Sequence, residues 1–412
     1  MKELAKNAKI ASKKLRAMGH DTRKAVLTAL ADKLIERKSE IIEANKKDLA
    51  YAEEIKLNAA MTDRLKLDDK GIESMVSGVR SIAEQEEVVG SFYKEFTQTN
   101  GLKIKRQRTP LGVILMIFES RPNVVVDCAA LAIKSSNAIV LKGGKEAKHS
   151  NEKLGEIIQD TIQNFIPKES VQVLASDNRE VIDELLNMDE FIDVVIPRGG
   201  ERLINHVYKH AKMPVIAHFQ GLCHMYLDES ADVEKAIKLV VNAKTQRTGV
   251  CNAIESLIVH KNLLPKVAGE LVSKLQEKGT ELRVDSEFMK AANAELKAAT
   301  SEDWATEYLE NILSIKTVNS LDEAIEHIDQ YGSNHTECIV AEDTAAQERF
   351  LNSVDASCVV VNASTRFNDG GQLGLGAELG ISTTKIHAYG PMGAEQMTTT
   401  RFVVVGDGQV RE

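Results

Sequence analysis

The sequence predicts an α/β protein with two open-sheet domains and a projecting β-hairpin. From Gly112 onward, short apolar runs alternate with helix-like stretches, and a second series of the same kind follows Cys251. That alternation is typical of strands and crossover helices in a parallel sheet. With 412 residues, 43% of them hydrophobic, the chain can bury a large core and should hold two or three domains.

Residues 1–90 are predicted to be helical. Asp21-Thr22 is a plausible N-cap, and the apolar residues that follow it recur at helical spacing, namely Leu27, Leu30, Ala31 and Leu34. The charged, helix-like pattern continues from Glu53 to Gln85.

The composition indicates where the protein works. The first residues lack the apolar core of a signal peptide, and no stretch approaches the roughly 18 consecutive apolar residues of a membrane span. We therefore expect a cytoplasmic protein without a membrane partner. The net charge of -9 argues against nucleic acid as the main partner.

Residues 91–108 are predicted to form a β-hairpin, because their centre, Asn100-Gly101, favours a type I′ turn. The lysines and arginines alternate with Leu102 and Ile104, which fits the solvated face of a strand better than a nucleic-acid patch. An open hairpin edge needs a partner. Residues 398–406 can supply it, in the same subunit or, as we expect, in a neighbouring one, so 91–108 and 398–412 are predicted to form an oligomerisation arm of a homo-oligomer.

Two groups of strands define the expected domains. The first group is Val113–Phe118, Ala138–Leu141, Val171–Leu174, Asp193–Ile196 and Val215–Ala217, and the second is Ser256–His260, Ile312–Val318, Cys338–Ala341 and Cys358–Asn362. We expect one domain from residues 1–90 and 109–224 and another from 225–365. Residues 366–397 are expected to be a loop and helical return segment.

Cys251 is the strongest candidate for a nucleophile. The five cysteines show no CxxC pair, which indicates neither a disulfide framework nor a zinc site, and no metal is expected. Small and polar residues precede Cys251 and the apolar run Ser256–Val259 follows it. A thiol held where a loop meets a strand can attack a carbonyl, although most buried cysteines are simply small core residues.

Two glycine-rich strand ends are candidate phosphate sites. In the first, Lys142 and Lys145 flank Gly143-Gly144, and cations beside open backbone amides can hold a nucleotide phosphate. In the second, Pro197-Arg198-Gly199-Gly200 leads into a predicted helix, whose N-terminus would favour an anion, although an ordinary strand-to-helix turn has the same pattern. The late Gly374–Gly380 stretch fits a flexible loop better than a dinucleotide fingerprint.

Several motifs resemble the aldehyde dehydrogenase superfamily in their order along the chain: Pro110-Leu111-Gly112-Val113, Lys142, Gly249-Val250-Cys251 and Glu307. Sharper similarity to one branch, the γ-glutamyl phosphate reductases, runs almost end to end. It rests on Phe118–Asn123, Ile196–Gly200, Glu323–Ile328, Tyr331–Glu337 and Val361–Phe367.

The resemblance implies an aldehyde dehydrogenase-like fold and NADPH/NADP as cofactor. It implies that Cys251 is the nucleophile, that Lys142 contacts the adenosine ribose and its 2′-phosphate, and that Glu307 contacts the nicotinamide ribose. Without the resemblance, the preferred interpretation of Lys142 would be a surface lysine, and that of Glu307 a solvated glutamate at the edge of a helix.

One departure from the hydrolytic relatives is informative. They carry a water-activating glutamate in a Leu-Glu-Leu-Gly-Gly motif, whereas the matching stretch, Ala217–Cys223, has no carboxylate. Without a general base for water, an acyl-enzyme would survive until hydride or phosphate reached it. His218 is an alternative base, with packing or substrate contact as the other interpretation.

The remaining candidates concern the substrate. The side chain of Asn123 and the backbone N–H of Cys251 are candidate oxyanion donors, and Arg121 and Arg366 are candidates for the substrate carboxylate or acyl phosphate. The resemblance implies NADPH-dependent reduction of L-glutamyl 5-phosphate to L-glutamate 5-semialdehyde, the second step of proline synthesis, with a possible contact to glutamate 5-kinase. The rivals are a hydrolytic aldehyde dehydrogenase and a catalytically silent nucleotide-binding scaffold.

Overall fold

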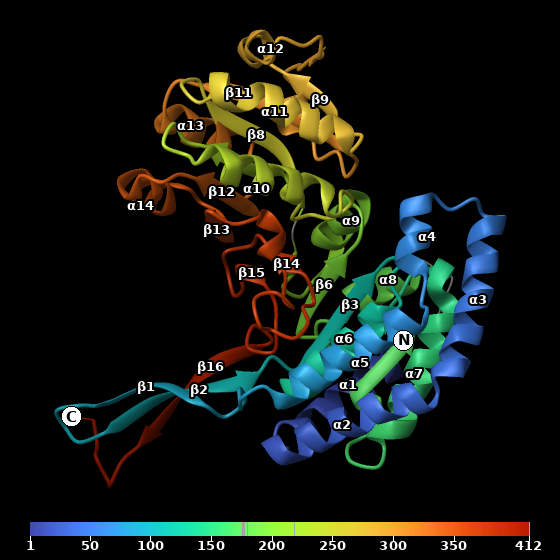
Figure 1. Cartoon of the computed structure of the whole chain (residues 1–412). Coiled ribbons are helices and arrows are strands. Elements are labelled where there is room, and N and C mark those ends of the chain that lie inside the picture. Colours follow the sequence, from blue (N-terminus) through green and yellow to red (C-terminus); the bar gives the residue numbers. More distant parts are fainter. Residues whose placement is uncertain (175–177, 179, 218, 412) are drawn as a thin grey trace. The chain divides into compact units, whose positions relative to one another are not determined.

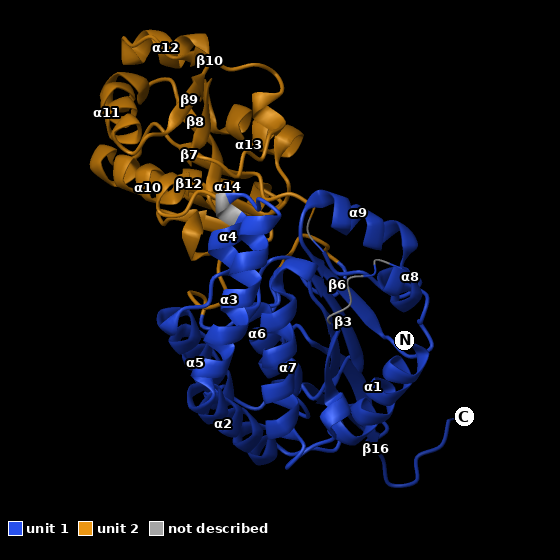
Figure 2. Cartoon of the chain, turned by 90° about the vertical axis from the view of Figure 1, so that its right-hand side faces the viewer, with its two compact units in different colours: residues 1–217, 374–380, 386–412 blue, residues 218–373, 381–385 orange. Residues whose placement is uncertain are grey.

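The computed structural model describes residues 1–174, 178, 180–217 and 219–411. The chain forms two compact units (Figure 2). Unit 1 comprises residues 1–217, 374–380 and 386–412, and unit 2 comprises residues 218–373 and 381–385. The border between them thus precedes the expected one at 224/225, and unit 1 also includes most of the return segment and the arm.

Unit 1 is a four-stranded parallel sheet with helices around it. The strand order is β5-β4-β3-β6, from Val171–Leu174, Ala138–Lys142, Val113–Phe118 and Val194–Arg198. The helices are α1 (Lys2–Leu15), α2 (His20–Glu36), α3 (Lys38–Glu54), α4 (Ala59–Leu65), α5 (Asp69–Glu84), α6 (Asn123–Lys134), α7 (Lys148–Ile162), α8 (Glu180–Leu186) and α9 (Glu201–His210). β3 and β4 are buried along their whole length, which explains why every residue of the two strands is apolar except Lys142 at the end of β4.

The predicted N-cap of α2 is wrong. The helix begins at His20, with Gly19 at the N-cap and no side-chain cap hydrogen bond. Asp21 instead lies in the first turn, where its charge favours the helix dipole. The predicted apolar stripe is confirmed, since Leu27, Leu30 and Leu34 are fully buried.

The predicted hairpin forms, but its partner strand comes from the same chain. β1 (Phe92–Thr97) pairs with β2 (Lys103–Pro110), and Gly101 adopts a positive φ in the turn between them. β16 (Thr398–Val405) pairs antiparallel with β2 of the same chain, which contradicts the expected docking of this strand on a neighbouring subunit's hairpin. The three strands project away from the helices of unit 1 (Figure 1).

Unit 2 is built on a seven-stranded parallel sheet of order β10-β9-β11-β8-β7-β12-β13. Its strands are β7 (Cys223–Leu227), β8 (Ile254–His260), β9 (Glu281–Val284), β10 (Lys297–Ala298), β11 (Ile312–Val318), β12 (Thr336–Val340) and β13 (Cys358–Val361). Its helices are α10 (Val233–Thr245), α11 (Leu264–Glu277), α12 (Ser286–Ala292), α13 (Leu321–Tyr331) and α14 (Thr344–Ser353). The short β14 (Ile381–Ser382) and β15 (Gly390–Pro391) lie in the return segment.

The strand expected at Val215–Ala217 is wrong, because only Val215 makes an isolated bridge, to Val195. Among the described helices, none has the length and apolar character needed to cross a bilayer.

Candidate active site

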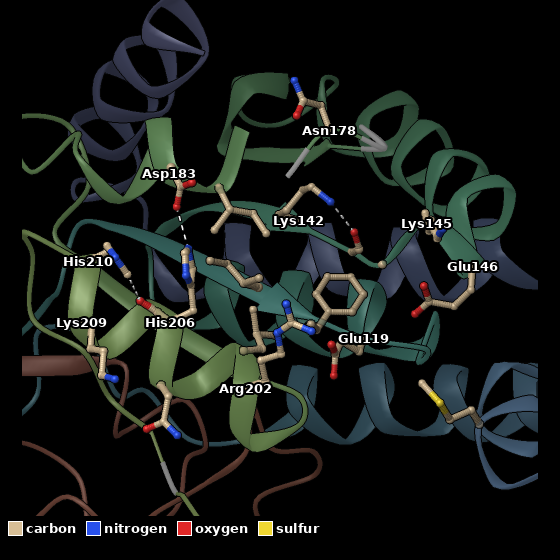
Figure 3. A pocket seen from close by; sticks show the side chains of 18 residues that line it. Glu119, Lys142, Lys145, Glu146, Asn178, Asp183, Arg202, His206, Lys209 and His210 are labelled. Atoms are coloured by element: carbon tan, nitrogen blue, oxygen red, sulfur yellow. Dashed lines mark hydrogen bonds and ion pairs between the residues drawn. The ribbon is translucent and has the colours of Figure 1, made fainter. Parts of the chain in front are cut away.

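Unit 1 contains a cavity of about 1030 Å³ at the carboxyl ends of β3 and β4. Ligands of open α/β sheets bind at such strand ends. Figure 3 shows Lys142, from β4, and Arg202, from α9, extending into this cavity. Lys145 and Lys209 also line it, so its wall offers several cations.

Gly143 and Gly144, which follow β4, lie where any side chain would clash with neighbouring atoms. A Cβ atom at Gly143 would lie 2.1 Å from Asn151 Nδ2, and one at Gly144 would lie 2.1 Å from Glu146 Oε1. Asn151 is only 1% exposed, and neither polar atom of its side chain has a hydrogen-bond partner within the described part of the chain. A cradle of this kind, with an unsatisfied buried amide beside it and cations around it, fits a nucleotide phosphate.

Lys142 is not a surface lysine. It is 6% exposed, and its Nζ donates a hydrogen bond of 2.7 Å to the carbonyl oxygen of Gly143. The neighbouring Glu146 accepts hydrogen bonds from Ser120 N at 2.6 Å and Ser120 Oγ at 2.7 Å. Its carboxylate is therefore hydrogen-bonded within the protein, and Lys142 and Lys145 stay the candidates for a phosphate.

The second predicted phosphate site holds a carboxylate of the protein itself. At the start of α9, Gly200 N donates to Glu119 Oε2 at 2.8 Å, and a Cβ at Gly199 would lie 2.4 Å from that oxygen. Arg198 donates to the carbonyl oxygen of Leu379 at 2.9 Å. None of the four residues 197–200 lines the large cavity, whereas Arg202, from the first turn of α9, does.

Arg121 and Asn123 lie at the beginning of α6 in unit 1. Asn123 Nδ2 donates to Asp127 Oδ2 at 2.9 Å, so one of its two amide hydrogens is used within the helix. Burial raises the pKa of Asp127 to about 6, with Asn123 and Arg198 acting in the opposite direction. Ser120, just before these residues, has a φ of +44°, a strained backbone that no pattern in the sequence indicates.

Cys251 lies in the turn that leads into β8 of unit 2 and is partly exposed. Its carbonyl oxygen accepts a hydrogen bond of 3.0 Å from Cys223 Sγ. Cys128, Cys223 and Cys338 are buried, and burial raises the pKa of each of these three thiols. A Cβ at Gly221 would lie 2.6 Å from both Cys251 Cβ and its carbonyl oxygen, so glycine is required beside the candidate nucleophile.

The residue after Cys251 ties this turn to the Val361–Phe367 motif and the loop beyond it. Asn252 Nδ2 donates to the carbonyl oxygen of Asn368 at 2.9 Å, and Asn252 O accepts from Thr365 Oγ1 at 2.7 Å. Both contacts are buried, so they hold the cysteine turn in place.

Arg366 belongs to the same motif, in a short 3₁₀ helix, η4 (Thr365–Phe367), and lines a cavity of about 260 Å³ in unit 2. Its Nε donates to Gln246 Oε1 at 2.9 Å. Burial lowers the pKa of the Arg366 guanidinium, while the Asp369 carboxylate and the Cys251 thiol raise it. The arginine therefore lies within electrostatic reach of the candidate nucleophile.

Glu307 is partly exposed in the loop before β11. Two residues later, Leu309 N donates to Glu255 Oε1 at 3.1 Å, and Glu255 Oε2 is 2.6 Å from Lys244 Nζ. Burial raises the pKa of Glu255 to about 7 against the effect of Lys244. This buried pair anchors the loop that carries Glu307. His218, the alternative base, lies outside the described residues.

Comparisons with known proteins agree with this arrangement. The aldehyde dehydrogenase family profile matches residues 1–295. The γ-glutamyl phosphate reductase of Francisella philomiragia is 48% identical over 411 residues, with 99% of each chain covered. The crystal structure of that enzyme from Thermotoga maritima has a TM-score of 0.95 and 41% identity, covering 100% of this chain and 99% of the other. An engineered glycolyl-CoA reductase solved with bound NADP⁺ shares the fold, with a TM-score of 0.72, 16% identity, and 98% and 96% of the two chains covered.

Proposed function

The chain belongs to the γ-glutamyl phosphate reductases of the aldehyde dehydrogenase family, and we propose that it reduces L-glutamyl 5-phosphate to L-glutamate 5-semialdehyde and phosphate with NADPH. The main support for this chemistry is the partly exposed Cys251. Hydrogen bonds of Asn252 hold the turn that contains this cysteine, and Gly221 lies directly beside it.

The reaction begins at Cys251. Its thiolate sulfur attacks the C5 carbonyl of the substrate, the bond to the phosphate oxygen breaks, and inorganic phosphate leaves a γ-glutamyl thioester on the enzyme. The developing oxyanion receives a hydrogen bond from the backbone N–H of Cys251, and one such donor contributes roughly 3–4 kcal/mol. The Asn123 amide, in unit 1, stays the candidate for a second donor. Arg121 and Arg366 bind the anionic groups of the substrate.

The cofactor site is assigned to the large cavity of unit 1. Lys142 and Lys145 of this cavity hold the 2′-phosphate, and Gly143 and Gly144 allow close approach of the backbone. The family resemblance alone assigns Glu307, in unit 2, to the nicotinamide ribose. When bound, the dihydronicotinamide supplies the hydride that reduces the thioester. The resulting thiohemiacetal on Cys251 collapses to the aldehyde and restores the thiolate.

Water does not compete, because no carboxylate stands in the Ala217–Cys223 stretch to activate it. This distinguishes the proposal from hydrolytic aldehyde dehydrogenation. With glutamate semialdehyde and NADP⁺, the enzyme should require added phosphate, whereas a hydrolytic enzyme would reduce NADP⁺ without it.

Replacement of the nucleophile tests the proposal directly. Cys251→Ser should abolish phosphate-dependent NADP⁺ reduction. Cys358→Ser is the matched control, because Cys358 is the other partly exposed thiol among the five, and it should retain activity. Undiminished turnover in Cys251→Ser would reject the thioester mechanism. A silent scaffold would instead show Cys251 no more reactive toward iodoacetamide than the other thiols.

A further inference from the structure

The small cavity of unit 2 brings a guanidinium and a carboxylate to one site. It is lined by Asn242, Gln246, Arg366, Phe367, Asp369 and Gln372. Arg366 and Asp369 come from one short segment, η4 and the loop that follows it, and both side chains line this cavity. The cavity thus offers one positive and one negative group to a small ligand.

Arg366 keeps its two terminal amino groups open. Its Nε donates to Gln246 Oε1, whereas neither Nη atom donates a hydrogen bond to any residue that the structure describes. A half-buried guanidinium with two unused donor groups is suited to a carboxylate, which accepts two parallel hydrogen bonds.

The two carboxylate oxygens of Asp369 have different hydrogen-bond partners. Oδ1 accepts from Gly371 N at 3.0 Å and Gln372 N at 3.2 Å, which holds the loop in a tight turn. Oδ2 accepts no hydrogen bond from the described residues. One oxygen therefore shapes the loop, and the other is left for a ligand that donates protons.

We propose that Asp369 Oδ2 binds the α-ammonium group of the substrate while the Nη groups of Arg366 bind its α-carboxylate. This inference rests on the proposed function, whose substrate carries both charges on one carbon. Two methylene groups separate that carbon from the carbonyl that Cys251 attacks. Asp369 is thereby the residue that makes the enzyme specific for an α-amino acid rather than for a simple dicarboxylic derivative.

The test uses Asp369→Asn, which keeps an oxygen to accept from Gly371 and Gln372 but replaces the free carboxylate oxygen with an amide. The phosphate-dependent oxidation of L-glutamate 5-semialdehyde is compared with that of 5-oxopentanoate, which lacks the α-ammonium group. The variant should lose about 10- to 100-fold in kcat/KM for the semialdehyde. Its kcat/KM for 5-oxopentanoate and its KM for NADP⁺ should be unchanged.

A binding measurement covers the case in which 5-oxopentanoate turns over too slowly. L-Glutamate and glutarate are used as competitive inhibitors, and Asp369→Asn should weaken inhibition by L-glutamate alone. Arg366→Gln should weaken both inhibitors, because both contain the carboxylate. Asp322→Asn, which alters a surface carboxylate paired with Arg349, is the control and should change neither.

Two failures have different meanings. Wild-type enzyme without phosphate-dependent oxidation of the semialdehyde would reject the proposed function itself. An active wild type together with an Asp369→Asn variant that loses nothing, or loses equally with both compounds, would reject only the role of Asp369.

Discussion

At the scale of single residues, Lys142 is predicted to bind the 2′-phosphate of NADPH. Its ammonium group is nearly excluded from solvent and donates to the carbonyl oxygen of Gly143. Lys142→Ala should raise the KM for NADPH about 10- to 100-fold, because a hydrogen bond to a charged group is worth about 1.5–3 kcal/mol. Parallel assays with NADH, which lacks the 2′-phosphate, provide the comparison. Equal losses with both cofactors would show that this lysine does not bind the 2′-phosphate.

Asp127 gives a prediction about stability and pH. Its pKa in the folded protein is raised to about 6, above the 3.8 of an unperturbed aspartate. Between about pH 4 and 6 the folded state therefore binds more protons than the unfolded state, and the free energy of unfolding falls as the pH rises. Asp127→Asn should be more stable than wild type by about 1–3 kcal/mol above pH 6 and by nothing below pH 4. Urea denaturation at pH 7.5 and pH 4 checks this, and an equal difference at both pH values would contradict it.

The sequence predicts residues whose chemistry is local, and it misses those whose role depends on distant contacts. Cys251 could be singled out because its turn and following strand are contiguous in the chain. Arg202 could not, because its place in the cavity depends on how α9 packs against β6. The role of Glu119 could not be predicted either, because only the fold brings its carboxylate to the backbone amide of Gly200.

At the scale of elements, the approach of Gly221 to the cysteine turn predicts the effect of a single methyl group. Gly221→Ala would force Cys251 to move, because a Cβ would lie 2.6 Å from two of its atoms. A displacement of about 1 Å at a reacting group can cost on the order of 100-fold in rate. We expect kcat to fall by about that factor while NADPH binding, measured by fluorescence, is retained.

Gly269→Ala is the matched control for that variant. Gly269 lies within α11, and no described atom outside its own stretch of helix lies within 4 Å of the position that its Cβ would occupy. The change should leave kcat unaltered and stabilise the helix by about 0.5–1 kcal/mol. A similar loss of activity in both variants would show that the Gly221 effect is not specific to the cysteine turn.

The strand predictions succeeded for runs rich in apolar and β-branched residues, and failed for a short strand that contains a buried histidine. The strand Val113–Phe118 has the predicted bounds, because all its residues are apolar and buried. Ile312–Val318 also has its predicted bounds, because isoleucine, threonine and valine, which favour strands, outweigh its polar residues. β7 was missed, since its fully buried His224 looks polar in the sequence. The Nδ1 atom of His224 lies 2.9 Å from Glu337 Oε2. This partner is more than a hundred residues away in the sequence, so no local pattern reveals it.

At the scale of the whole molecule, the β1-β2-β16 sheet leads to a prediction about assembly. Phe92, Tyr93, Phe402 and Val404 on these strands are each about half exposed, and their exposed apolar surface is typical of an interaction site. Deleting residues 97–103 and closing the gap with a short turn should yield monomers, as measured by sedimentation. Val404→Asp, which leaves the backbone intact, should weaken the same assembly. An unchanged oligomer in both variants would exclude the arm as the main assembly element.

The pairing of β16 with β2 also has a consequence for how the protein is made. Pro110 pairs with Thr398, so β2 leaves the ribosome about 290 residues before the strand that covers its edge. At about 5–20 residues per second, that edge stays unpaired for roughly 15 to 60 seconds of translation. Throughout that interval the nascent chain carries an open template for strand addition, which chaperones must shield. A ribosome stalled before residue 398 should therefore hold a chain in which the arm is incomplete, however well the rest of unit 1 has folded.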